Sequence, residues 1–518
     1  MPSFHTLLLS AVVGLTGPAH AADPVASAAR CLEDFDLACA SDAVNRVSAG
    51  QERRILDVRV AFHQGRYDDA MAGLQALEAD GYDLAAEDPQ TPYVATAEAA
   101  QGMTEHRGER VAVRVQPGVD AIVAEDAVEV LGVARRTYDD LFGGGPGHDI
   151  VLDIFPTTRR FTAATGLPED AVAKTNVIAL SKWTRLLLTS PRARARGYAW
   201  KDTVSHEYIH LVVAFRTRNQ APVWLQEGLA KHLESWWRGD RGGGLSPHHE
   251  GLLADAVDND SFVPFEKFAR SMAYLDSSEE AALAFAQVST MVQFLLHRAG
   301  PDALPTVMDR VGAGEEAKAV VADVARFPDF TAFEIGWKAW LKTQPLFAEK
   351  LSALPVVAEG ATDEFAGDPL LAGRPDLARY ARLGDLLRER GRCEAALVEY
   401  DKAADPAEPP SPLLVARRAQ CHEELGDPAE ALRLVQETAA LYPEFVLLQT
   451  TRGRLLDAAG RRREAVEAWK AAHDINPYDP AVQDALVAGY DAIGDDASAR
   501  RHLRYARILA GRPAGEDG

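Results

Sequence analysis

The 518-residue chain has few cysteines and no long hydrophobic segment. Four cysteines are too few to hold a chain of this length together as a disulfide scaffold. No run reaches the roughly 18 apolar residues that a membrane-spanning helix needs. Basic residues are also in deficit, because 55 Lys and Arg stand against 77 Asp and Glu, a net charge of -22. This balance argues against nucleic acid or an anionic membrane as the main partner.

The composition is otherwise that of an ordinary globular protein, with 47% hydrophobic and 25% charged residues. At about 100–200 residues per domain, the length predicts several domains. The first residues have the pattern of a secretory signal peptide, because a short apolar run at 6–15 is followed by an Ala-His-Ala cleavage pattern at 19–21. We therefore predict cleavage after Ala21 and export to the periplasm or the extracellular space. A buried first helix is the alternative.

The carboxyl-terminal third of the sequence repeats itself. Glycines recur every 34 or 35 residues, at Gly391, Gly426, Gly460 and Gly494. An alanine follows each of them by five residues, and the small side chain allows two helices to approach closely. The pattern resembles the tetratricopeptide repeat (TPR), a pair of antiparallel helices per unit. It covers 376–511, with 512–518 as a tail, and implies a binding surface for a protein partner or substrate.

The rest of the chain divides around a central region of different texture. A weaker copy of the repeat pattern predicts helical hairpins over 22–104. The central region, 105–345, is predicted to alternate strands and helices first and to be helical from 198 onward. Its predicted strands are at 110–115, at 150–155 and at two places within 176–190, with a helix at about 119–142. Residues 346–375 have the Pro, Gly and acidic content of a linker.

The candidate chemistry lies in an H-E-x-x-H motif, His206 to His210. On a helix, residues four apart share a face, so both imidazoles can reach one metal ion. Glu207 lies beside them and can act on a metal-activated water. The helix is apolar on most sides and is expected to be buried, where unpartnered histidines and a glutamate would be costly. A metal ion would supply the partner, and a pair of hydrogen-bonded core histidines is the alternative.

A second element contains Glu227, which lies 17 residues after His210. Residues 222–230 begin a helix with proline in its first turn, and the chain can return so that Glu227 faces the histidines. Two His and one Glu leave the fourth position of zinc open for water, which is the catalytic arrangement. Glu234 lies on the same face, where it either supports a ligand from behind or is a solvated charge. His232 points away and is not expected to be a ligand.

H-E-x-x-H followed by W-L-x-E-G-L-A at 224–230 resembles the peptidase MA-like gluzincins, secreted bacterial relatives of the thermolysin and aminopeptidase clan. The resemblance implies an α+β, mostly helical protein, in which a thermolysin-like domain with a small mixed sheet is flanked by helical repeats. It implies one Zn2+ per chain bound by His206, His210 and Glu227, with Glu207 as general base in peptide hydrolysis. It also implies that an edge strand within 174–190 pairs with an extended peptide.

The sequence departs from this clan at the oxyanion stabiliser. Related enzymes use a tyrosine or histidine, whereas the corresponding helix here offers Phe285, which has no hydroxyl. The substitutes to consider are Tyr208, Tyr274, His248 and His249, although the last two are expected to be exposed in a Gly-rich loop. A non-catalytic TPR scaffold or adaptor, carrying a relict metal-binding domain, is therefore the alternative function.

A basic stretch precedes the metal motif. Residues 171–201 contain seven Lys and Arg and no Asp or Glu. They either pair with the acidic repeats or form a positively charged wall near the cleft that favours acidic peptides.

The four cysteines allow two disulfides. Cys393 and Cys421 are predicted to lie on the same side of the stacked repeats and to form one in an oxidising compartment. Cys31 and Cys39 are a second candidate pair, and four buried thiols are the alternative.

Overall fold

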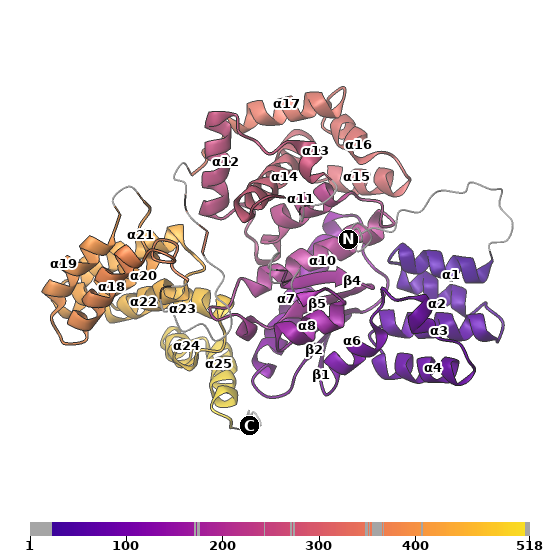
Figure 1. Ribbon diagram of the computed structural model, residues 1–518, viewed down its shortest axis with the longest axis horizontal. Helices are drawn as coiled ribbons and strands as arrows, with labels where there is room; N and C mark the ends of the chain where they lie inside the picture. The colour runs from indigo at the N-terminus through magenta and orange to yellow at the C-terminus, as the bar shows by residue number, and fades with distance from the viewer. Residues whose placement is uncertain are drawn as a thin grey trace.

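The computed structural model describes residues 23–512, apart from a few short segments. These segments are 170–171, 173–176, 243, 270–271, 273–274, 348–350, 352, 355–364, 366 and 406–407. The predicted signal peptide and Tyr274 lie outside the described residues. The described chain is mostly helical around one small sheet (Figure 1). None of its helices combines the length and the apolar character that a membrane crossing requires.

Short helices form the amino-terminal part, drawn in indigo in Figure 1. They are α1 (Pro24–Glu33), α2 (Leu37–Val44), α3 (Gln51–His63), α4 (Tyr67–Ala79), α5 (Leu84–Glu87) and α6 (Tyr93–Ala100). A disulfide joins Cys31 of α1 to Cys39 of α2, so the structure contains the second candidate bridge. Ala70 and Leu74 of α4 are buried, as the repeat-like spacing requires.

The described sheet has five strands in the order β1-β2-β3-β5-β4. They are β1 (Thr104–Gly108), β2 (Val111–Val115), β3 (Ile150–Phe155), β4 (Ala179–Lys182) and β5 (Arg185–Thr189). The central three run parallel, and β1 and β4 are antiparallel strands at the two edges. The predicted strands are confirmed. The sequence did not predict β1, because its residues are polar and largely exposed and therefore show no apolar alternation.

Two long helices lie against the sheet, α7 (Ala121–Leu141) and α10 (Trp200–Arg216). The first confirms the predicted helix at 119–142. A helical layer above them in Figure 1 contains α11 (Val223–Leu233), α12 (Pro247–Asn259), α13 (Phe265–Phe268), α14 (Ser278–Ala299), α15 (Ala303–Gly312), α16 (Ala317–Val324) and α17 (Phe330–Leu341). One hydrophobic core runs through both layers and includes Trp200, Tyr208 and Trp337, which are fully buried. This core fixes α10 between the sheet and α11.

The repeats form a stack of paired helices at the left of Figure 1, coloured orange to yellow. They are α18 (Pro375–Arg388), α19 (Cys393–Ala403), α20 (Pro412–Glu424), α21 (Pro428–Leu441), α22 (Val446–Ala458), α23 (Arg462–Ile475), α24 (Pro480–Ile493) and α25 (Asp496–Leu509). The four spaced glycines each adopt a positive φ in the turn between two paired helices, with values from 68° to 85°. This left-handed conformation suits glycine, which explains the period.

The cysteines of the repeats differ from expectation. Cys393 and Cys421 are both buried free thiols, so the expected disulfide between them is not formed in the structure. The Cys393 thiol instead donates to Oε2 of Glu424 at 3.1 Å. Burial is the main reason that the pKa of each thiol is raised, which keeps both protonated.

The later repeats contact the central domain through a buried polar network. The ammonium of Lys201 in α10 lies 2.7 Å from a carboxylate oxygen of Asp126 in α7 and 2.7 Å from one of Asp474 in α23. Nε2 of His473 lies 3.0 Å from Oδ2 of Asp126, the same oxygen that Lys201 contacts. Ordinary surface ion pairs contribute little to stability. These groups are largely withdrawn from water, so the loss of one partner would cost much free energy of folding. The network therefore holds α23 against the two helices that carry the central core.

Candidate metal centre

The H-E-x-x-H histidines and Glu227 meet at one point between α10 and α11. One nitrogen or oxygen from each of His206, His210 and Glu227 lies within 4.8 Å of the others. The two Nε2 atoms are 3.1 Å apart. Oε2 of Glu227 is 3.6 Å from Nε2 of His206 and 3.5 Å from Nε2 of His210. The structure thus brings together the three residues that the sequence pattern selected.

These separations fit a metal ion. A tetrahedral zinc with bonds of about 2.1 Å places neighbouring ligand atoms about 3.4 Å apart, and the three observed separations are 3.1, 3.5 and 3.6 Å. The electrostatics agree. Burial would lower the pKa of His206, but the hydrogen bonds that its ring donates to Glu227 and Glu234 outweigh burial and raise that pKa to about 10. A site that holds a proton this tightly favours positive charge, and a divalent cation would satisfy the same groups.

Glu234, the residue after α11, lies behind His206. Its Oε2 is 2.9 Å from Nδ1 of His206, and its Oε1 accepts from Lys231 at 2.6 Å. When Nδ1 donates to this carboxylate, a neutral His206 carries its lone pair on Nε2, the nitrogen on the side of Glu227 and His210. Of the two sequence-based alternatives for Glu234, the geometry is that of a buried support and not of a solvated charge. His232 is buried and is not among the converging donors.

Glu207 is placed between the metal donors and the sheet edge. Its side chain is buried, with 8% exposure, and burial raises the pKa of its carboxyl against the lowering effect of His210 and His206. A raised pKa suits a carboxylate that must accept a proton near neutral pH. The backbone N–H of Ser181 in β4 also bonds to this carboxylate. The predicted edge strand therefore exists as β4 and adjoins the candidate base.

Of the sequence-derived substitutes for the oxyanion stabiliser, Tyr208 has its hydroxyl bound elsewhere. The hydroxyl of Tyr208 donates to Oδ1 of Asp139 at 2.5 Å on the α7 side. His248 and His249 are in the first turn of α12 and are half-buried, so the expectation of an exposed loop was wrong. Ser246 caps this helix and a proline opens it, and these signals outweigh the preceding glycines.

The basic stretch is mostly neutralised inside the protein. Arg192 pairs with Asp120 at 2.6 Å, and Lys201 has its two carboxylates. Arg196 donates to the carbonyl of Gly367 and lies over the ring of Phe445. Arg185 pairs with Asp153, and Lys182 lies over Trp183. Repeat residues supply only part of this pairing, and Lys174 lies outside the described residues. A continuous charged wall is not what the structure shows.

One residue of this stretch, Tyr198, was not singled out by the sequence. Tyr198 precedes α10, and its phenol interacts electrostatically with both Arg194 and Glu207. The available sequence signal was an aromatic residue just before α10, the helix that carries both histidines.

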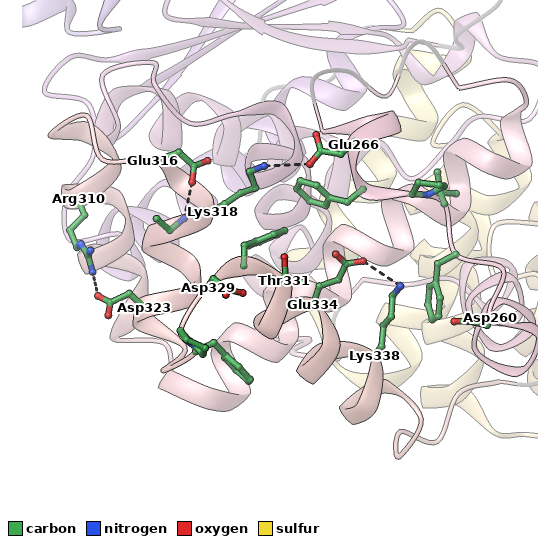
Figure 2. A pocket seen from close by; sticks show the side chains of 18 residues that line it. Asp260, Glu266, Arg310, Glu316, Lys318, Asp323, Asp329, Thr331, Glu334 and Lys338 are labelled. Carbon is green, nitrogen blue, oxygen red and sulfur yellow. Dashed lines mark hydrogen bonds and ion pairs between the residues drawn. The ribbon is translucent and has the colours of Figure 1, made fainter.

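A separate hollow of about 970 Å³ opens among α13, α15, α16 and α17 (Figure 2). Phenylalanines such as Phe265 and Phe330 line it, together with charged side chains. Figure 2 shows two of its lysines paired, Lys318 with Glu266 at 3.4 Å and Lys338 with Glu334 at 3.3 Å. None of His206, His210 and Glu227 lines the hollow, so it is distinct from the candidate centre.

Residues 193–343 match the Peptidase MA superfamily. The match includes both helices that carry the donors and extends just beyond α17. The chain is also 26% identical over 104 residues to the small glutamine-rich tetratricopeptide repeat-containing protein 2 of Mycosarcoma maydis. That alignment covers 20% of this chain and 29% of the relative, so the chain spans less than a third of the relative's length.

Solved structures offer weaker likenesses. Native leukotriene A4 hydrolase from Saccharomyces cerevisiae is 12% identical, with a TM-score of 0.32, 79% of this chain and 67% of that chain being covered. The MamA protein is 18% identical, with a TM-score of 0.24, 26% of this chain and 73% of that chain being covered. Scores this low support no functional conclusion.

Proposed function

We propose that this protein is a zinc-dependent metallopeptidase in which His206, His210 and Glu227 hold one Zn2+ ion. The observation that carries the proposal is the triangle of donor atoms, whose sides of 3.1, 3.5 and 3.6 Å match the ligand spacing of tetrahedral zinc. The superfamily match over the same helices supports it. Glu234 supports this donor set, because its contact with Nδ1 favours the tautomer of His206 that a metal ligand needs.

The residues around the centre suit peptide hydrolysis. Zinc bound by these donors would acidify a water molecule and polarise the scissile carbonyl. Glu207 would take the proton of the attacking water and deliver it to the leaving amine, and its buried, raised-pKa carboxyl suits both steps. The unpaired edge of β4 would hold an extended substrate by main-chain hydrogen bonds next to Glu207.

We also propose that the repeats bind a protein partner or substrate and that the protein is exported. The periodic helix pairs α18–α25 support the first part, because such stacks present extended binding surfaces. The disulfide between Cys31 and Cys39 supports the second, because structural disulfides persist in oxidising compartments.

Metal analysis and a peptide-library assay on the purified full chain test the enzyme proposal. We expect about one zinc per chain in the wild type. Glu227→Gln should bind zinc much more weakly, and Glu207→Gln should keep the metal but lose hydrolysis. Glu334→Gln, in α17, is a matched control that should change neither zinc binding nor hydrolysis. Wild-type protein without zinc, prepared without chelators, would refute the proposal.

The same assay separates the alternative function, a non-catalytic scaffold. That alternative is favoured by Tyr208, whose hydroxyl is committed to Asp139, and by Phe285, which has none. A relict site predicts that zinc-loaded wild type and Glu207→Gln both leave the whole peptide library uncut.

A further inference from the structure

Arg194 has no ion pair with a carboxylate among the described residues, in a stretch where its neighbours are held. Its side chain is half-buried, and its buried Nε has no hydrogen-bond partner among the described residues. Arg192 and Arg196, two positions away on either side, are held by Asp120 and by the Gly367 carbonyl. Partial burial without a partner is costly for a guanidinium, and burial lowers its pKa. A negatively charged ligand would remove that cost.

Tyr198 places Arg194 on the side of the candidate base. A turn joins the two residues, because the N–H of Gly197 donates to the carbonyl of Arg194 at 3.1 Å. The Tyr198 hydroxyl donates to the carbonyl of Thr189 at the end of β5. Burial raises the pKa of this phenol, Arg194 lowers it and Glu207 raises it further, so both charges act on the same hydroxyl.

The sheet register gives the spacing along the substrate edge. The N–H of Thr189 donates to the carbonyl of Ile178 at 2.8 Å, whereas Ser181 adjoins Glu207. Ile178 and Ser181 are three residues apart, which is about 10 Å along a strand. The hydroxyls of Ser181 and Thr189 are also buried and lack hydrogen-bond partners within the described structure. Unpartnered hydroxyls therefore lie both at the strand position beside Glu207 and at the end of β5, where the Tyr198 hydroxyl is bound.

We propose that Arg194 binds a carboxylate of the substrate, about three residues from the bond that Glu207 helps to cleave. The inference rests on the proposed peptidase function and names its substrate class, peptides with an acidic side chain or a free carboxyl terminus at that distance. Arginine suits this role because its planar donors match a carboxylate. Arg194 would be a specificity residue and take no part in the chemical step.

Peptide binding to the full-length, zinc-loaded Glu207→Gln protein tests this without cleavage. The probes are fluorescent peptides of one length in which a single Glu is moved through a Gln and Ala background, with a free or an amidated carboxyl terminus. We expect one Glu position, or the free terminus, to improve binding about tenfold, and salt to reduce the gain. The two arms distinguish a side-chain carboxylate from a terminal one.

Variants assign the preference to one residue. Adding Arg194→Gln should remove the tenfold gain, and Arg194→Lys should keep part of it, because the charge remains but the paired donors are lost. Arg192→Gln removes the same charge nearby and should keep the gain. A preference that survives Arg194→Gln, or no preference at all, overturns the inference. If the preference depends on Arg194 but zinc-loaded wild type cuts no peptide, the carboxylate-binding role of Arg194 is supported and the peptidase proposal is refuted.

Discussion

Glu234 and His206 are joined by a contact of 2.9 Å between Oε2 and Nδ1, although 28 residues separate them in the sequence. The contact determines which ring nitrogen of His206 faces the other two donors. It also connects the metal centre to Lys231, which holds the second oxygen of the same carboxylate at 2.6 Å.

Glu234→Ala should weaken zinc binding about 10–100-fold, because the ring of His206 loses the acceptor that fixes its tautomer and orientation. Competition with a chromogenic chelator measures the change. Glu334→Ala removes a glutamate of the same domain that lies outside the centre and should leave zinc affinity unchanged. An equal affinity in wild type and Glu234→Ala would show that the contact does not support the metal.

Lys201→Met should destabilise the protein by about 3–5 kcal/mol, because it removes the cation that bridges Asp126 and Asp474, and the side chain of Asp126 is only 5% exposed. Lys470 pairs with the same Asp474 at 2.6 Å but is far more exposed, so Lys470→Met is a matched control with an expected loss below about 1 kcal/mol. Chemical denaturation followed by tryptophan fluorescence compares them. Similar losses in the two variants would contradict a buried network.

Acid should weaken the contact between the repeats and the central domain. Burial would raise the pKa of Asp126, but Lys201 and His473 outweigh it and hold the pKa well below the usual 3.8. A depressed carboxylate pKa gives stability that is complete above the unfolded value and is lost as the pH falls toward the folded value. The stability gap between wild type and Asp126→Asn should therefore shrink below about pH 4. A gap that is constant between pH 7 and about pH 3 would refute this.

Thiol counting tests the disulfide assignment. The structure predicts two reactive thiols in unfolded, unreduced protein, Cys393 and Cys421, and four after reduction. In the folded protein both should react slowly, because they are buried and their pKa values are raised. No free thiol in the unfolded, unreduced protein would show instead that the repeat cysteines do form the bridge that the sequence suggested.

Local patterns made much of this architecture predictable. The H-E-x-x-H spacing fixes the relative position of His206 and His210 on any helix, and a compact return of the chain brings Glu227 to them. The repeat glycines were visible because a left-handed turn selects one residue type. Strand β1 was missed because an exposed edge strand needs no apolar alternation.

Long-range pairing was not predictable. Whether Glu234 was solvated or buried depended on how α10 and α11 pack, which one sequence does not specify. The basic stretch shows the same limit, because Arg192 and Lys201 find carboxylates of α7 and its cap, more than 70 residues earlier. Only the folded structure separates these paired cations from Arg194.

The main chain of Tyr198, just before the metal-binding helix, donates to the carbonyl of Ile475 at 3.1 Å. The segment between β5 and α10 is thus hydrogen-bonded to the end of α23, a part of the chain that is synthesised much later. During biosynthesis the candidate metal ligands of α10 and α11 are made long before Ile475, which accepts this hydrogen bond. The proposed substrate edge is therefore complete only after the third repeat has folded, so the proposed peptidase activity would begin only when nearly the whole polypeptide has been made.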